Sequence, residues 1–289
     1  MPELPEVEVV KRSLTSKVEN LIIKKVKVND GRLRYLINKK KVSKIIGLRF
    51  KKIERRSKFL LFFFNKNIIM LAHLGMTGKF FFIDQKNKKF KTSFYYKIKK
   101  KNDQSHDRVV FFLNKNQKLI YNDVRKFGFI KLLNKKDYND SFHLRNLGPE
   151  PLGKEFNYFY FKLYIKGRSR AIKEILMDQK FVSGIGNIYA NEILFLSKVK
   201  PTRKVKNLKS YEINKIVKIS KKVLKNAINL GGSSIKDFSS SNGKRGVFQE
   251  HFNVYGKNGD PCSHKGCRSK IIKSTISNRA TFFCFKCQK

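Results

Sequence analysis

The stretch that decides the fold lies at residues 169–199 and reads SRAIKEILMDQKFVSGIGNIYANEILFLSKV. Apolar residues recur at helical spacing on both sides of SGIGN, so the pattern predicts a helix, a tight turn and a second helix. Gly184 and Gly186 permit backbone conformations that side chains disfavour, and Asn187 can cap the second helix. Exposed N–H groups at that helix start would bind a phosphate. A plain helical hairpin is the alternative.

The residues on the C-terminal side predict a metal-bound hairpin. All four cysteines stand in the last 28 residues, with the spacing C-x4-C, sixteen residues, C-x2-C. Four thiolates in this pattern predict one structural Zn²⁺ per chain, bound by Cys262, Cys267, Cys284 and Cys287. Four free buried thiols are the alternative. The strand-like residues between the pairs are interrupted at Ser277-Asn278, which places Arg279 near the tip of a β-hairpin.

The residues before the opening stretch predict a β domain with one leading helix. Apolar positions recur at helical spacing from about Pro5 to Val18, and strand signals separated by Asn and Gly turns dominate from Ile22 to Leu133. We therefore expect an α+β protein with an N-terminal antiparallel β-sandwich domain and a C-terminal helical domain that ends in a zinc-ribbon β-hairpin. The expected boundaries are 1–135 for the sandwich, 136–157 for a linker, 158–246 for the helices and a loop, and 247–289 for the zinc finger.

The charge balance predicts a polyanionic partner. The chain has 289 residues, with 66 Lys and Arg against 21 Asp and Glu, and a formal net charge of +45. Such a charge repels itself in a compact fold unless a polyanion screens it, and nucleic acid is favoured over an anionic membrane. No run of 18 apolar residues exists, and the N-terminus has acids where a signal peptide has bases. We expect a cytoplasmic protein that binds no membrane.

The first eight residues, MPELPEVE, place two prolines and three carboxylates at the chain start. If Met1 is removed, Pro2 becomes a secondary amine with a pKa of about 8, which a helix N-terminus and basic surroundings would lower further. An unprotonated Pro2 could attack a sugar aldehyde carbon and form an iminium, with Glu3 and Glu6 moving protons. The alternative is a helix that simply begins with a proline and acids.

Two further segments, HLGMTG (73–78) and YNDVRKFGF (121–129), predict strands that end in turns. Met76 and Phe127 are apolar residues at these turns, and Arg125 neighbours Phe127. An apolar wedge beside an arginine suits a protein that separates stacked bases and fills the gap. Buried hairpin residues are the alternative.

Taken together, these segments resemble the bacterial formamidopyrimidine-DNA glycosylase family, the helix–two-turn–helix DNA repair enzymes. The resemblance runs from end to end of the chain. It is carried in order by PELPEVE, RRSKFLLF, HLGMTG, YNDVRKFG, LGPEPL, DQKFVSGIGNIYANEILF, GGSS, VYGKNGDPC and NRATFFCFKCQK. It implies that residues 158–246 form a helix–two-turn–helix domain with a lesion-covering loop.

The resemblance also implies a role for each matching residue. Pro2 would be the Schiff-base nucleophile and Glu3 the acid/base near the deoxyribose ring oxygen, while Lys58 and Arg279 would contact phosphates and assist elimination. The remaining positions would be the gap-filling Met76, Arg125 and Phe127, the DNA-contacting His106, Arg125 and Asn187, and a loop around Ser233, Ser234 and Phe238 over the flipped base. The chain departs from the family pattern at the x4 spacing of the first cysteine pair, where His264 could compete as a ligand, and at Val124 and Lys126.

The implied activity is that of a bifunctional DNA glycosylase/AP lyase. Such an enzyme excises oxidised purines, namely 8-oxoguanine and formamidopyrimidines, from duplex DNA and nicks the strand at abasic sites by β,δ-elimination. We expect it to act as a monomer. An endonuclease VIII-like glycosylase for oxidised pyrimidines is the nearest alternative, and a non-catalytic zinc-ribbon nucleic-acid-binding protein is the alternative from another class.

Overall fold

The computed structural model describes residues 1–92, 104–233 and 248–289. They form two compact units: the first comprises Met1–Arg145 and the segment that begins at Leu230, and the second comprises Asn146–Asn229 and Phe248–Lys289. Across these described ranges, no helix is both long and apolar enough to cross a bilayer.

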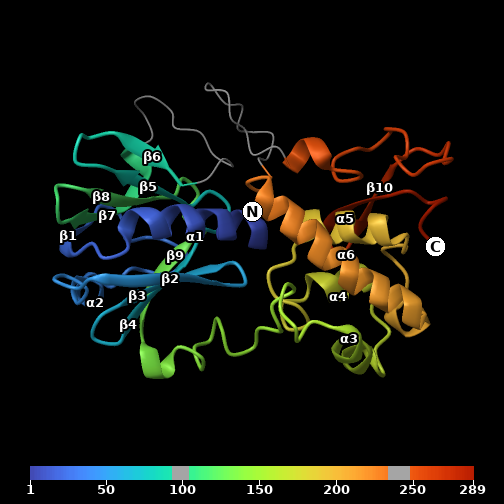
Figure 1. Ribbon diagram of the computed structural model, residues 1–289, viewed down its shortest axis with the longest axis horizontal. Coiled ribbons are helices and arrows are strands. Elements are labelled where there is room, and N and C mark those ends of the chain that lie inside the picture. The colour runs from blue at the N-terminus through green and yellow to red at the C-terminus, as the bar shows by residue number, and fades with distance from the viewer. Residues whose placement is uncertain (93–103, 234–247) are drawn as a thin grey trace. The chain divides into compact units, whose positions relative to one another are not determined.

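The first unit contains two antiparallel sheets and a leading helix (Figure 1). One sheet has the strand order β1-β7-β8-β5-β6 and the other has the order β2-β3-β4-β9. Helix α1 packs against β2 and β3 of one sheet and β5 of the other. The elements are α1 (Leu4–Val18), β1 (Ile23–Val28), α2 (Lys39–Ser43), β2 (Phe50–Arg56), β3 (Phe59–Phe64), β4 (Ile68–His73), β5 (Lys79–Ile83), β6 (Lys89–Lys91), η1 (Gln104–His106), β7 (Asp107–Leu113), β8 (Lys118–Asn122), β9 (Phe129–Asn134) and η2 (Lys135–Asp137).

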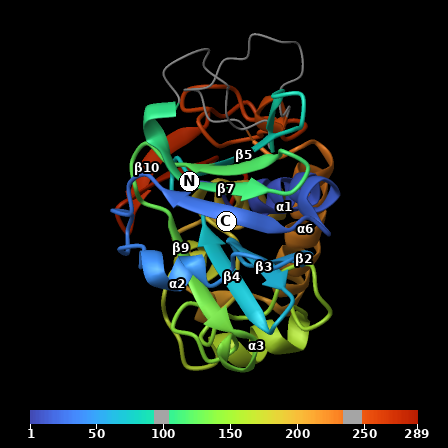
Figure 2. The same cartoon turned by 90° about the vertical axis from the view of Figure 1, so that its left-hand side faces the viewer.

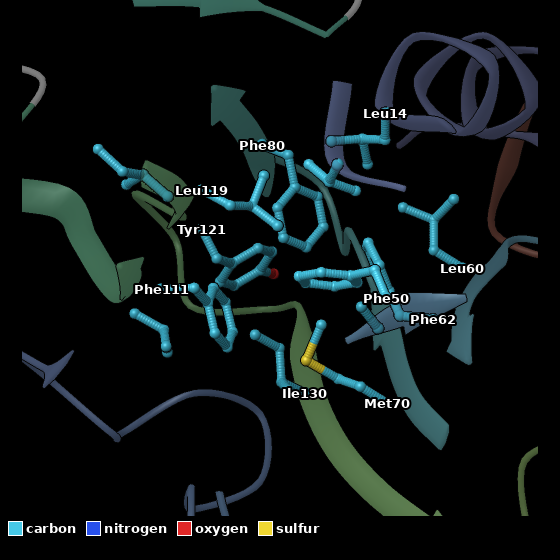
Figure 3. Close-up of a cluster of buried hydrophobic side chains, with 14 of the residues drawn as sticks. Leu14, Phe50, Leu60, Phe62, Met70, Phe80, Phe111, Leu119, Tyr121 and Ile130 are labelled. Atoms are coloured by element: carbon cyan, nitrogen blue, oxygen red, sulfur yellow. The ribbon is translucent and has the colours of Figure 1, made fainter. Parts of the chain in front are cut away.

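The core of this unit lies between the two sheets, which face each other in Figure 2. Phe50 and Phe62 come from the four-stranded sheet, whereas Phe80 and Tyr121 come from the five-stranded one (Figure 3). The rings of Phe62 and Phe80 lie 5.4 Å apart between their centroids and so join the sheets directly. Aromatic residues favour strands and each buries a large apolar surface, which explains why Phe-rich segments build this sandwich.

The second unit is helical and carries a two-stranded hairpin. Helix α5 packs against α4, α6 and strand β11, and α3 packs against α6 (Figure 1). Ser277 and Asn278 both have left-handed φ values, +48° and +57°, as a two-residue hairpin turn requires. The elements are α3 (Tyr158–Ile165), α4 (Ile172–Met177), α5 (Asn187–Ser197), η3 (Val205–Asn207), α6 (Ser210–Asn229), η4 (Phe248–His251), β10 (Ile272–Ile276) and β11 (Arg279–Phe283). The α+β class expected from the sequence is confirmed.

The structure differs from the sequence-based expectations in local details. Helix α1 starts at Leu4, one residue earlier than expected. Asn187 does not cap α5: Gly186 is the N-cap residue, and the Asn187 side chain bonds elsewhere. The segment from Leu230 belongs with the first unit rather than with the preceding helix. Of the predicted lesion loop, Ser233 is described, whereas Ser234 and Phe238 lie outside the described residues.

Candidate active site

The start of helix α1 is buried together with its acids. Pro2 is buried, and Glu3 is only 3% exposed. Pro5 suits the first helical turn, where its missing N–H leaves no bond unmade. The Glu6 oxygen Oε2 accepts the backbone N–H of Glu3 at 2.9 Å. This bond fixes the backbone that carries Pro2 and Glu3.

Glu6 also binds Ser233, which is 227 residues away in the chain. Its Oε1 accepts the backbone N–H of Ser233 at 2.8 Å and the hydroxyl at 2.9 Å. The neighbouring Gly232 has a φ of +78°, and a Cβ there would lie 3.1 Å from Glu6 Oε1. Only glycine meets both conditions without strain. Glu6 therefore ties the chain start to the first residue of the predicted lesion loop.

The chain terminus lies where a charged amine is disfavoured. With Met1 in place, the terminal amine stands one residue before the nitrogen of Pro2. Burial lowers the pKa of this amine from its ordinary value. Glu3 and Glu6 oppose the shift, whereas Lys58 and Arg125 add to it. The net direction is downward because desolvation disfavours the charged form more than the two acids favour it.

Lys58 lies between β2 and β3 and is buried. Burial lowers the pKa of the nearby His73 to about 4, and the positive charges of Lys58 and Arg34 contribute to the shift. His73 is therefore neutral at pH 7, and its Nδ1 accepts the backbone N–H of Gly75 at 3.1 Å. The terminal amine and His73 thus both lie in the field of Lys58.

Two turns of the first unit present the predicted wedge residues to solvent. Met76 is 42% exposed and Phe127 is 46% exposed. The Arg125 guanidinium lies over the Phe127 ring, 4.6 Å from its centroid, in a cation–π contact. The alternative of buried hairpin residues is therefore wrong for Met76 and Phe127.

Asp123 joins these two turns from beneath. It is fully buried, and its Oδ1 accepts the Thr77 hydroxyl at 2.5 Å while its Oδ2 accepts the Gly128 N–H at 2.9 Å. Thr77 Oγ1 in turn accepts the Arg125 N–H at 2.9 Å. A Cβ on Gly75 would lie 2.4 Å from the Gly128 nitrogen, so the turns touch through backbone. Asp123 and Thr77 were not among the residues predicted from the sequence, although both stand within the motifs YNDVRKFGF and HLGMTG.

His106 lies behind the same turn. Its carbonyl accepts the Asp123 N–H at 3.0 Å, and its Nδ1 lies 3.2 Å from the Arg108 Nη2. In the same turn, Lys126 Nζ forms an ion pair with Asp30 Oδ2 at 2.8 Å. The hydrogen bond from the Asp123 N–H to the His106 carbonyl therefore attaches His106 to the turn that carries Arg125 and Phe127.

In the second unit, the start of α5 holds the hairpin. Asn187 Nδ2 donates to the Ala280 carbonyl at 2.9 Å, and Lys173 Nζ donates to the same oxygen at 3.1 Å. Asn191 Oδ1 accepts the Phe282 N–H at 2.7 Å. Arg279, the first residue of β11, is exposed. The three side chains therefore fix the strand from which Arg279 projects.

Hydrogen bonds from the side chain of Gln179 stabilise the turn before α5. Gln179 Oε1 accepts the Gly184 N–H at 2.7 Å, and Gln179 Nε2 donates to the Ile185 carbonyl at 2.8 Å. Gly184 adopts a φ of +90°, as its predicted freedom allows, but Gly186 is extended with a φ of −131°. Nothing in SGIGN indicated the role of Gln179, because it precedes the turn.

The four cysteines converge as their spacing predicts. Their sulfur atoms all lie within 4.8 Å of one another, with 3.9 Å between Cys262 and Cys287 and 3.8 Å between Cys267 and Cys284. Four thiolates at about 2.3 Å from one tetrahedral ion are about 3.8 Å apart, so the cluster fits a metal ion. The His264 ring stacks on Phe195, with 4.2 Å between centroids, and its Nδ1 lies 3.7 Å from the Cys262 sulfur.

Comparison with known proteins decides the family. Residues 1–130 match the model of the formamidopyrimidine-DNA glycosylase N-terminal domain, and residues 147–239 match that of the formamidopyrimidine-DNA glycosylase H2TH domain. The chain belongs to the formamidopyrimidine-DNA glycosylase family. A formamidopyrimidine-DNA glycosylase from Rickettsia bellii is 40% identical over 289 residues, covering all of both chains.

Solved structures of family members agree with this assignment. The Lactococcus lactis enzyme in complex with DNA containing an abasic site has a TM-score of 0.85 and 32% identity, covering 99% of each chain. The wild-type enzyme of the same organism, in complex with DNA containing an oxidised pyrimidine, has a TM-score of 0.85 and 31% identity over all of both chains. The expected DNA glycosylase with a DNA partner is confirmed, and its AP lyase activity is consistent with the formamidopyrimidine-DNA glycosylase family.

Proposed function

We propose that the chain is a bifunctional glycosylase/AP lyase that excises oxidised purines from duplex DNA and nicks the strand by β,δ-elimination. The observation that carries this proposal is the burial of Pro2 and Glu3 beside the start of helix α1. Pro2 and Glu3 are both buried, and burial lowers the pKa of the Met1 amine, one residue before the Pro2 nitrogen. We expect the same burial to favour the neutral form of the Pro2 amine once Met1 is removed. A neutral amine is a nucleophile, whereas an ammonium is not.

The chemistry begins after Met1 is removed. The damaged nucleotide is everted, because C1′ cannot be reached inside the base stack. The Pro2 nitrogen forms a bond to C1′, and the base leaves with the electrons of its glycosidic bond. The proton that the Pro2 nitrogen loses after the attack neutralises the departing base. Glu3 protonates the ring oxygen as the C1′–O4′ bond breaks, which leaves an iminium between Pro2 and the opened sugar. Loss of the C2′ proton then expels the 3′-phosphate, and a second elimination expels the 5′-phosphate.

The other site residues take supporting roles in this proposal. Lys58 contacts a phosphate next to the lesion and assists the eliminations, and Arg279 grips the strand from the hairpin. Met76, Arg125 and Phe127 fill the gap left by the everted nucleotide, while His106 and Asn187 contact the backbone. Glu6 orders the loop entrance through two hydrogen bonds accepted from Ser233 and positions Glu3 through a third, accepted from the Glu3 N–H. The lesion loop itself begins at Ser233 and continues through Ser234 and Phe238.

We assign the metal ion as Zn²⁺, bound by Cys262, Cys267, Cys284 and Cys287. Four cysteine thiolates are a common ligand set of structural zinc sites, and the sulfur separations of 3.8 and 3.9 Å suit a zinc ion. The bound ion supplies folding free energy to the hairpin. It takes no part in the proposed reaction.

We also propose that the protein works as a monomer in the cytoplasm, where it meets DNA. Oxidised pyrimidines form a second candidate substrate class, because a solved relative holds DNA with such a lesion.

Cleavage of matched duplexes carrying 8-oxoguanine, a formamidopyrimidine or thymine glycol tests the proposal. We expect faster single-turnover excision of the two purine lesions, followed by a one-nucleotide gap. Faster excision of thymine glycol would favour the pyrimidine alternative. Binding without cleavage of any duplex, including one with an abasic site, would contradict the catalytic proposal.

A further inference from the structure

Helix α3 in the second unit has large apolar side chains that are exposed within the part of the chain that the structure describes. Phe159 is 79% exposed and Leu163 is 73% exposed, and the two residues stand at i and i+4 on one face of the helix. Tyr211, in the first turn of α6, is also largely exposed. Single exposed apolar residues are ordinary, but a contiguous group of them marks a binding surface.

Phe159 and Leu163 line a groove of about 590 Å³ between α3, η3 and the start of α6. We call the apolar lining residues of this groove its floor and the lysines that line it its border. Its apolar lining residues are Phe159, Leu163, Ile165, Val205, Leu208 and Ile213. Its charged lining residues are Lys162, Lys166 and Lys206, and none of the described residues that line it is acidic. The groove therefore combines an apolar contact surface with positive charge.

The acid nearest to this groove in the sequence is already engaged. Glu212 Oε1 accepts from Arg203 Nη1 at 2.6 Å, and its Oε2 accepts the Lys209 N–H at 2.7 Å. Ser210, which lines the groove, starts a helix of 20 residues, and a helix N-terminus adds partial positive charge. An occupant must therefore be acidic as well as apolar.

The location of the groove separates it from the DNA-contacting residues of the same unit. Helix α3 and the β10–β11 hairpin lie on opposite sides of α6 (Figure 1). Nucleic acid would satisfy the lysines but would leave the apolar floor without a matching partner. A second copy of this chain, with a net charge of +45, would repel the lysine border.

We propose that this groove, the α3 groove, binds an acidic peptide segment of a partner protein, with apolar side chains on the floor and carboxylates at the lysine border. This inference does not depend on the proposed catalytic function. Helix-and-groove recognition of this kind uses a few apolar anchors for affinity and charge for orientation.

Fluorescence anisotropy of a labelled synthetic peptide tests the proposal. The probe is a peptide of about twelve residues in which Asp and Glu alternate with Phe and Leu. We expect saturable binding to the full chain, weakened about tenfold or more by Phe159→Ala or Leu163→Ala, since anchor residues carry most of the affinity. The double substitution Lys162→Glu with Lys206→Glu should weaken binding similarly and reduce its dependence on salt.

Matched variants control for general effects of charge and apolar surface. Lys225→Glu changes an exposed lysine of α6 about 22 Å along the helix from Ser210, and Phe142→Ala removes an exposed phenylalanine from the first unit. Both should leave peptide binding unchanged. Unchanged melting temperatures and abasic-site nicking would show that all of these variants are folded.

Three results would overturn the proposal. The first is equal binding of peptides in which Asp and Glu are replaced by Gln, or in which Phe and Leu are replaced by Ser. The second is competition by an undamaged oligonucleotide that is abolished by the α3 variants, which would make the face a nucleic-acid surface. The third is a concentration-dependent dimer in sedimentation that Phe159→Ala disperses, which would make it a self-association surface.

Discussion

At the scale of single residues, Glu6 shows how one carboxylate organises the chain start. It accepts hydrogen bonds from Glu3, which stands beside the proposed nucleophile, and from Ser233, where the predicted lesion loop begins. Charge-assisted bonds of this kind are stronger than neutral ones. The same side chain therefore links the position of Pro2 to that of the loop.

Gly232 is predicted to be irreplaceable in this arrangement. Gly232→Ala places a Cβ at 3.1 Å from Glu6 Oε1 at a φ of +78°, which we expect to cost about 1–3 kcal/mol of folding free energy. Urea unfolding measures the loss. Gly31→Ala is the control, because a Cβ there meets its neighbours at 3.4–3.5 Å, and it should change stability by less than about 0.5 kcal/mol. Equal stability of both variants would show that Glu6 does not constrain this segment.

His73 is predicted to make stability depend on pH. Its folded pKa of about 4 lies below the unfolded value of about 6.5, so between these values the unfolded chain binds more protons. The contribution of His73 to the free energy of unfolding is therefore fully present above about pH 6.5. It is lost as the pH drops toward 4, by up to about 3 kcal/mol. His73→Gln should flatten this slope in urea unfolding, whereas His251→Gln, at an exposed site, should preserve it. The same slope in all three proteins would contradict the inference.

At the scale of elements, the wedge depends on two turns that are far apart in the sequence. Asp123 and Thr77 stand 46 residues apart, yet their side chains join the turns that carry Met76 and Phe127. Phe127 is therefore held at the surface by buried bonds beneath it.

Phe127→Ala is predicted to slow lesion excision more than it slows nicking of a pre-formed abasic site. Opening the stack costs a few kcal/mol, and an abasic site has no base left to expel. We expect a loss of about tenfold or more in single-turnover excision of 8-oxoguanine, and a smaller loss on the abasic duplex. Phe142→Ala, which removes an exposed ring outside the wedge, should affect neither rate. Equal losses on both substrates would indicate that Phe127 only supports the fold.

The hairpin is predicted to depend on its metal ion. Cys284→Ser removes one of the four sulfur atoms that converge there, and loss of zinc removes the folding free energy of the segment. Arg279 would then lose its fixed strand, and affinity for DNA should fall. Metal analysis should find one zinc per wild-type chain, and electrophoretic mobility shift should show weaker binding by the variant. Ser263→Ala, beside a ligand, is the control. A wild-type chain without zinc, or a fully active Cys284→Ser protein, would contradict this account.

At the scale of the whole molecule, the features that could be predicted from the sequence are those that depend on residues close together in the chain. The cysteine cluster, the strand-rich first half and the helices around SGIGN follow from short-range patterns. The bond from Glu6 to Ser233 and that from Thr77 to Asp123 link distant positions, and no spacing rule indicates such pairs. For the same reason, the sequence grouped residues 230–233 with the helix before them, whereas the structure groups these residues with the first unit.

The central claim is that the nitrogen of Pro2 attacks the sugar. With Met1 attached this nitrogen is a tertiary amide, which has no nucleophilic lone pair. Borohydride reduces the iminium to a stable amine, so it should trap a covalent complex between lesion DNA and the N-terminal peptide that begins at Pro2.

The most direct measurement compares trapping by the processed chain with trapping by a chain whose N-terminus keeps an uncleaved extension. We expect the processed chain to be trapped on 8-oxoguanine DNA through Pro2, and Pro2→Gly to be trapped more weakly. The extended chain should bind the same DNA but form no covalent complex. An extended chain that excised 8-oxoguanine at the normal rate, or a covalent bond mapped to another residue, would contradict the account.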